Sequence, residues 1–94
     1  MVGVRRSQLL NFRGKPHVDG KTGDVMFIAY MGLRLIPCRV KRSVLKRLTA
    51  NPVPTEEDLL QAFADYRKRI EQLVGEQVAD GEFSPVIGEL NNIP

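Results

Sequence analysis

The sequence contains one cysteine, Cys38, and one histidine, His17, among its 94 residues. One thiol cannot form a disulfide within the chain, and these two side chains are too few for a cysteine-based or histidine-pair zinc site. We therefore expect no metal and no cofactor. A chain without a disulfide framework also fits a reducing compartment, the cytoplasm.

Long apolar runs are also missing. The longest run covers residues 25–33 and stops at Arg34, far short of the roughly 20 residues that cross a bilayer. Near the N-terminus, Arg5 and Arg6 are followed only by the two leucines of residues 9–10, which is no apolar core for a secretory signal. We expect a cytoplasmic protein that has no membrane partner.

The chain is short for an enzyme. Its 94 residues can bury one modest core and leave little room for a deep substrate cavity. The sequence predicts a single domain over residues 1–94. We expect a folded core over residues 8–81 and a tail over residues 82–94 that is docked in part through its apolar side chains.

One long amphipathic helix is predicted over residues 55–81. Thr55 can cap its first turn, the acids that follow complement the helix dipole, and Asp58 is placed for a variant of the capping box. Gly81 can take the left-handed conformation that ends a helix. The helical spacing is carried by Leu59, Phe63, Tyr66, Ile70 and Leu73.

Two runs before this helix have the composition of strands, being rich in β-branched, aromatic and aliphatic residues. They cover residues 25–30 and 33–40, and the two residues between them suit a tight hairpin. Both runs are apolar on two faces over part of their length. Because Pro37 cannot donate a ladder hydrogen bond, we expect the second strand to be an edge or bulged there.

The remaining elements are shorter. Residues 8–12 predict a strand, residues 13–24 a glycine- and proline-rich connection, and residues 42–49 a short helix that ends before the prolines of the next loop. Together the elements predict an α+β fold. It consists of a small three-stranded antiparallel sheet with one short and one long helix packed on one face.

Three groups of residues could carry chemistry, and each has a simpler structural interpretation. The Gly-Lys-Thr of residues 20–22 resembles the end of a phosphate-binding loop, but the earlier glycine is one place off and a strand follows. His17 has no nucleophile nearby in sequence. Cys38 is near Arg39 and Lys41, which could lower its pKa, but its strand position favours burial. We expect no catalytic residue and no enzyme.

The charges are divided between the two halves of the chain. Residues 1–50 hold eleven Lys or Arg against two acids, a balance of +9, and residues 51–94 hold three against nine, a balance of −6, which sum to the net charge of +3. Such a division can mark a nucleic-acid surface, two halves of one domain that attract each other, or a dimer.

Apolar, glycine, cysteine and charged residues follow one another along the chain in the order Leu10, Phe12, Val25, Phe27, Gly32, Ile36, Cys38, Val40, Leu45, Phe63, Arg67, Ile70 and Glu71. This order of residues resembles a family of small bacterial proteins of unknown function, DUF1488. The resemblance covers residues 8–81 and is carried mainly by core positions. It implies a compact α+β domain with a small antiparallel sheet against helices, and it implies no activity, cofactor or catalytic residue. Lys41, where a small capping residue is common, and the basic first half depart from the pattern.

The leading hypothesis is a non-enzymatic cytoplasmic protein-interaction domain that binds an unknown protein partner or a second copy of itself as a homodimer. It follows from the strands that are apolar on two faces and from the opposite charges of the two halves. The alternative is a nucleic-acid-associated protein, in which a basic strand and the short helix bind phosphates. Its candidate residues are Arg34, Arg39, Lys41, Arg42, Lys46 and Arg47.

Overall fold

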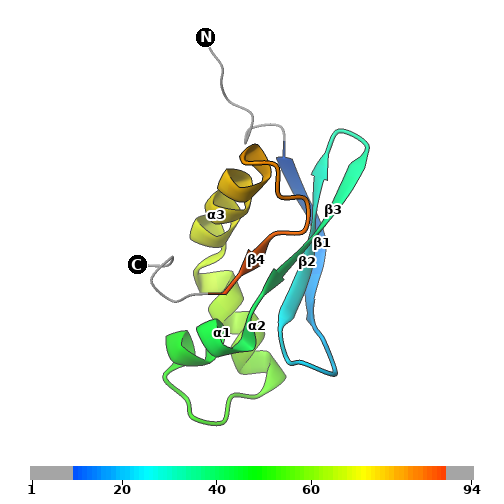
Figure 1. The fold of residues 1–94 in the computed structure, drawn as a ribbon. Helices are drawn as coiled ribbons and strands as arrows, with labels where there is room; N and C mark the ends of the chain where they lie inside the picture. Colours follow the sequence, from blue (N-terminus) through cyan, green and yellow to red (C-terminus); the bar gives the residue numbers. More distant parts are fainter. Residues whose placement is uncertain (1–9, 89–94) are drawn as a thin grey trace.

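The computed structural model describes residues 10–88. In chain order the elements are β1 (Leu10–Val18), β2 (Val25–Met31), β3 (Arg34–Val40), α1 (Arg42–Thr49), α2 (Glu56–Asp65), α3 (Arg67–Ala79) and β4 (Val86–Ile87). Figure 1 shows the helices on one side of the sheet, with α1 and α2 near one end and α3 toward the other. The fold is α+β, as predicted from the sequence.

The sheet is mixed and has the strand order β1-β2-β3-β4. The first three strands are antiparallel neighbours, whereas β4 pairs parallel to β3 through Arg39 with Val86 and Val40 with Ile87. The prediction of a three-stranded antiparallel sheet is therefore wrong in strand number and direction. The reason is that Ile87, which is completely buried, brings the segment after α3 back beside β3.

β1 is longer than the strand predicted for residues 8–12. Its pairing with β2 is interrupted between Arg13 and His17 and then resumes, and Gly14 takes a φ of 79° within the interruption. The glycine and proline residues therefore form a bulge inside a strand, where a loop was predicted.

The turn between β2 and β3 lies one residue later than predicted. Met31 still pairs with Arg34, so Gly32 and Leu33 form the two-residue connection. Gly32 has a φ of 63°, which suits the first central position of a type II′ turn. Leu33 is fully exposed at 105%.

Two helix predictions are confirmed. α1 covers the predicted residues 42–49 and buries Val44 and Leu45. α2 begins with the capping box: the Thr55 hydroxyl oxygen accepts a hydrogen bond from the Asp58 N–H at 3.1 Å, and the Thr55 N–H donates to Asp58 Oδ2 at 3.0 Å.

The long helix predicted over residues 55–81 is two helices. The chain leaves helical geometry at Tyr66, where φ is −111° and ψ is 17°, so that α2 ends and α3 begins with different directions. Each helix buries its own stripe of apolar residues, which includes Phe63 on α2 and Ile70 on α3. The break lets both stripes reach the same sheet face, and α3 then ends before Gly81, whose φ is 96°.

The core lies between the three helices and the inner face of the sheet. Phe27 is at its centre, because its ring lies 4.9 Å from that of Phe63 on α2 and 6.2 Å from that of Phe12 on β1, measured between centroids. The buried side chains of β2 and β3 are Val25, Phe27, Ala29, Ile36, Cys38 and Val40. Within residues 10–88, no helix is long and apolar enough to cross a membrane.

Candidate interaction surface

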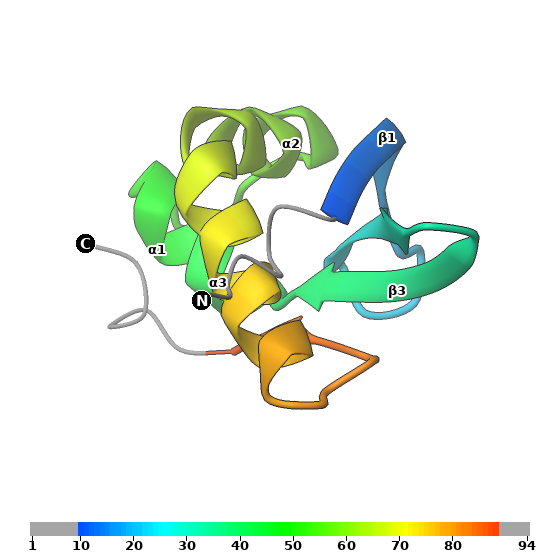
Figure 2. The same ribbon diagram turned by 90° about the horizontal axis from the view of Figure 1, so that it is seen from above.

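The second face of the sheet, here called the outer face, is not covered by any helix of the described chain, as the view along the sheet in Figure 2 shows. Because side chains alternate along a strand, every position paired across the sheet with an outward residue is also outward. The outer face consists of Asn11, Arg13 and His17 from β1, Met26, Ile28 and Tyr30 from β2, Leu35, Pro37 and Arg39 from β3, and Val86 from β4.

The centre of the outer face is apolar. Ile28 pairs directly with Pro37, and Tyr30 with Leu35, so these four side chains form one continuous patch. Leu35 keeps 54% of its surface exposed and Val86 keeps 42%. A sheet face that meets only water normally carries polar residues at such positions, which makes this face the strongest candidate for an interaction surface.

A hollow of about 200 Å³ opens beside this patch, between β3 and β4. It forms because β4 pairs with β3 only at Arg39 and Val40. On the N-terminal side of these residues, the two segments of the chain are not paired and leave a gap. Pro37 borders this gap. The hollow is lined by Met26, Pro37, Cys38, Arg39, Ser84, Pro85 and Val86.

The outer wall of the hollow is fixed by a side chain of α3. Gln77 Nε2 donates to the Val86 carbonyl at 3.1 Å, and Gln77 Oε1 accepts from the Val86 N–H at 3.2 Å. This amide therefore replaces a neighbouring strand for a β4 that is only two residues long. The backbone of Val86, and with it one wall of the hollow, is therefore held in place by hydrogen bonds.

The end of the sheet near α1 is organised by Asp24, which is 5% exposed. Its Oδ1 accepts the backbone N–H of Arg42 at 2.7 Å, and its Oδ2 accepts Arg39 Nη1 at 2.7 Å. Burial alone would raise the pKa of Asp24, but these hydrogen bonds outweigh it and hold the pKa below its usual value. Asp24 thus caps α1 from another element, because Lys41 at the N-cap makes no side-chain capping bond.

The turn before Asp24 adds a second acid to this junction. Asp19 lies 3.5 Å from Arg39, and its pKa is lowered, first by the Lys21 N–H that donates to it. The residues 20–23 form a turn as predicted, closed by the Gly23 N–H to the Asp19 carbonyl at 2.8 Å. Arg39 therefore contributes little free positive charge to the outer face.

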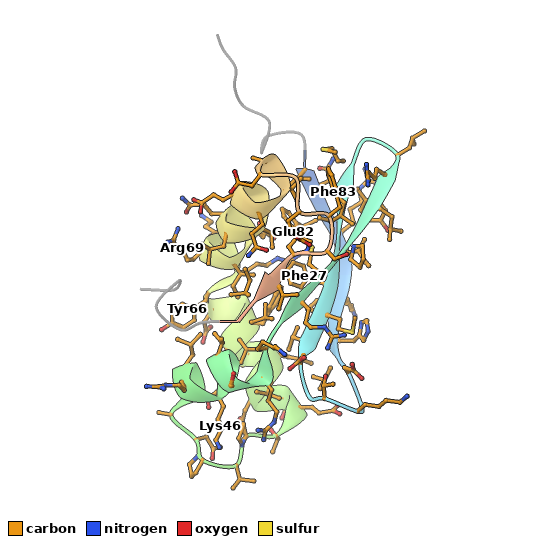
Figure 3. All side chains as sticks on the ribbon, viewed as in Figure 1. Phe27, Lys46, Tyr66, Arg69, Glu82 and Phe83 are labelled. Atoms are coloured by element: carbon orange, nitrogen blue, oxygen red, sulfur yellow. The ribbon has the colours of Figure 1, made fainter. Side chains whose placement is uncertain are left out.

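The six predicted basic residues do not form one cluster. Arg39 is neutralised as described, and the Arg34 guanidinium stacks on Phe83 at 3.9 Å from the ring centroid. β3 rises about 3.3 Å per residue, so about 20 Å separate Arg34 from the end of the strand where α1 begins. Figure 3 shows Phe83 and Lys46 near opposite ends of the molecule. The structure brings together only Lys41, Arg42, Lys46 and Arg47, at α1.

The two candidate reactive side chains are separate. His17 is exposed on the outer face opposite Met26. Cys38 is buried under the helices, as predicted, and burial raises the pKa of its thiol to about 11. Among the described residues, no group of three or more His, Cys, Asp or Glu side chains could hold a metal ion.

A second hollow, of about 280 Å³, lies between α1 and α2 and has a polar lining that includes Asp58 and Tyr66. Its acidic groups are already engaged within the chain. Asp58 Oδ2 accepts from Asn51 Nδ2 at 3.0 Å as well as from the Thr55 N–H, and Asp65 accepts from Gln61 at 2.9 Å. These carboxylates stabilise the start and the surface of α2.

Comparison with known proteins identifies the family. The family model described as "Protein of unknown function (DUF1488)" matches residues 10–87. The chain belongs to the DUF1488 family. The predicted resemblance is thereby confirmed.

A solved DUF1488 structure has a similar fold. It is the crystal structure of a protein of unknown function from Shewanella loihica PV-4, with a TM-score of 0.77 and 20% sequence identity, and the match covers 90% of this chain and 96% of that one. At this identity the likeness concerns the fold alone. No curated protein matches this DUF1488 chain.

Sequence reasoning did not find the hollow beside β4. Val86 and Ile87 are too short a strand to show an alternation, and only the apolar content of residues 82–94 indicated docking. The apolar character of the outer face could be predicted in part, because residues 25–30 and 33–40 are apolar at both odd and even positions.

The Asp24 junction gives a stability prediction. Asp24→Ala should lower the free energy of unfolding by about 3 kcal/mol, because it leaves Arg39 without its closest partner and the Arg42 N–H without an acceptor. Urea denaturation at pH 7 measures this loss. Asp19→Ala, which removes only the longer contact to Arg39 and a turn bond, should cost less. An unchanged midpoint for Asp24→Ala would contradict the assigned role.

Because the folded pKa of Asp24 is depressed, its stabilisation is present above pH 4 and is lost as pH falls through the folded pKa. Wild type should therefore lose more stability than Asp24→Asn between about pH 5 and pH 2.

The Cys38 thiol gives a reactivity prediction. Since its pKa is about 11 and its side chain is buried, the native protein at pH 8 should react very slowly with a thiol reagent such as Ellman's reagent. The unfolded protein in urea should react at once. Val53→Cys, at a position that is 77% exposed, serves as the control and should be labelled rapidly in the native state. Rapid labelling of native wild type would show that Cys38 is accessible.

Proposed function

We propose that this DUF1488 chain is a non-enzymatic cytoplasmic protein-interaction domain, and that a second copy of the chain binds its outer face to form a homodimer. The observation that carries the proposal is the apolar patch of Ile28, Tyr30, Leu35 and Pro37 on a sheet face that no described helix covers. Contiguous exposed apolar surface is uncommon on proteins that remain monomeric.

The charges on the outer face suit a self-complementary contact. In a two-fold dimer the same surface meets itself, so an unneutralised charge at its centre would face its own copy. Arg39 is paired with Asp24 and Asp19. The Arg13 guanidinium lies over the Tyr30 ring, 5.9 Å from its centroid, so this cation borders the apolar patch on the β1 side. Two outer faces can therefore meet with the Arg39 charge of each copy neutralised and with each Arg13 packed on an aromatic ring beside the patch.

The size of the outer face sets the expected affinity. It offers three side chains from each of β1, β2 and β3 and one from β4, whereas one side of a stable interface typically has about 20–30 residues. The proposed dimer is therefore weak and reversible. Its dissociation constant should lie in the micromolar range.

Sedimentation velocity across a concentration series tests the dimer. Wild type should pass from monomer to dimer between about 1 and 100 µM, and Leu35→Lys should remain monomeric because it puts a charge in the apolar centre. Val53→Lys is the matched control: it replaces an exposed apolar residue, between α1 and α2, and should dimerise like wild type. A wild type that remains monomeric throughout the series would overturn the homodimer.

A second candidate function is nucleic-acid association through α1. It is favoured by one observation: none of the ion pairs within the described residues involves Lys41, Arg42, Lys46 or Arg47. Four basic side chains near one short helix can contact phosphates and release counterions. This surface is distinct from the outer face.

Fluorescence anisotropy with short mixed-sequence DNA and RNA tests this candidate. With four phosphate contacts, affinity should fall by about 50- to 150-fold between 50 and 200 mM salt, and the pair Lys46→Glu and Arg47→Glu should abolish binding at the higher salt. The pair Lys15→Glu and Lys68→Glu makes the same change of net charge away from α1 and should weaken binding less. Absence of binding at 50 mM salt would remove the candidate.

A further inference from the structure

Leu33 is the most exposed large hydrophobic side chain in the described part of the chain, at 105%. It occupies the tip of the turn between β2 and β3, beside Gly32, where a polar residue or glycine usually lies. The turn geometry requires Gly32, whose φ is positive, but it places no demand for a large apolar side chain at the next position. Leu33 therefore contributes nothing visible to the fold of its own chain.

The hollow beside β4 has a volume and an apolar lining that suit a leucine side chain. Its volume is about 200 Å³, and an apolar cavity of about 150 Å³ is enough to hold a benzene-sized group. Pro37, Pro85 and Val86 give it apolar walls, and the Gln77 amide holds the Val86 wall in place. The charge of Arg39, which also lines the hollow, is neutralised by Asp24.

Leu33 cannot reach the hollow of its own chain. Leu33 directly precedes Arg34 at the start of β3, whereas Val86 of the hollow pairs with Arg39 near its end. Arg34 and Arg39 are five residues apart, and each residue of a strand spans about 3.3 Å, so about 17 Å separate the turn from the hollow along β3. A two-fold dimer can bring Leu33 of one copy to the hollow of the other copy. If the strands of two facing sheets run in opposite directions, the turn of each copy lies over the β4 end of the other.

We propose that Leu33 of each copy inserts into the hollow between Pro37 and Val86 of the other copy, and that this reciprocal contact anchors the homodimer. The inference rests on the proposed function, since it names the contact that fixes the geometry of the outer-face dimer. A side chain that fills a well-packed pocket of the partner and is fully desolvated there can carry a large share of the binding energy of an interface. It also fixes the antiparallel orientation of the two sheets.

Disulfide trapping between two single variants tests the geometry. Leu33→Cys and Val86→Cys, each combined with Cys38→Ala because Cys38 lines the hollow, are mixed in equal amounts under mild oxidation. Linked peptides are identified by mass spectrometry. Since a disulfide requires Cβ atoms about 3.5–4.5 Å apart, the mixture should yield the Leu33–Val86 cross-link at least tenfold faster than either variant alone yields its own. Faster formation of a link between two Leu33→Cys chains would overturn the antiparallel arrangement.

A change in affinity tests the anchor itself. Leu33→Ser should weaken dimerisation by about tenfold or more, because two buried leucine side chains are lost per dimer, and it should leave the thermal midpoint of the monomer unchanged because Leu33 is exposed there. If Leu33→Ser dimerises like wild type while Leu35→Lys does not dimerise, the outer face is the interface but Leu33 is not its anchor. If wild type does not dimerise, the proposed function itself fails.

Discussion

The carboxylate of Asp24 is the interaction on which the arrangement of this domain depends. It lies where the turn after β1, the end of β3 and the start of α1 meet, and each of its oxygens accepts a hydrogen bond of 2.7 Å from a different partner. Lys41 makes no side-chain cap for α1, so the first turn of that helix relies on Asp24. The same carboxylate neutralises Arg39, which removes a free cation from the outer face.

The two faces of the sheet have different roles that follow from their side chains. The inner face packs Phe27 against Phe12 and Phe63, and three helices exclude water from it. The outer face is also apolar at its centre, although no described helix covers it. A fold that needs only one covered face gives no reason for Ile28 and Leu35 on the other, and a contact with a second copy supplies one.

Much of the fold could be predicted from the sequence, and the errors have physical causes. The helix of residues 42–49 was predicted with correct bounds, because its apolar positions are regular and prolines follow. The break at Tyr66 was missed because helical spacing continues through it without glycine or proline. β4 was missed because two residues show no period. Of the candidate site, the apolar character of the outer face could be predicted, whereas the hollow depends on how β4 diverges from β3.

The most direct test of the central claim, that the outer face binds a second copy, is a series of NMR spectra of wild type recorded at increasing concentration. The account predicts that methyl signals of Ile28, Leu33, Leu35 and Val86 shift together with one dissociation constant, while those of Val53 and Leu60 do not move. Spectra that stay constant to millimolar concentration, or shifts confined to the helices, would contradict it.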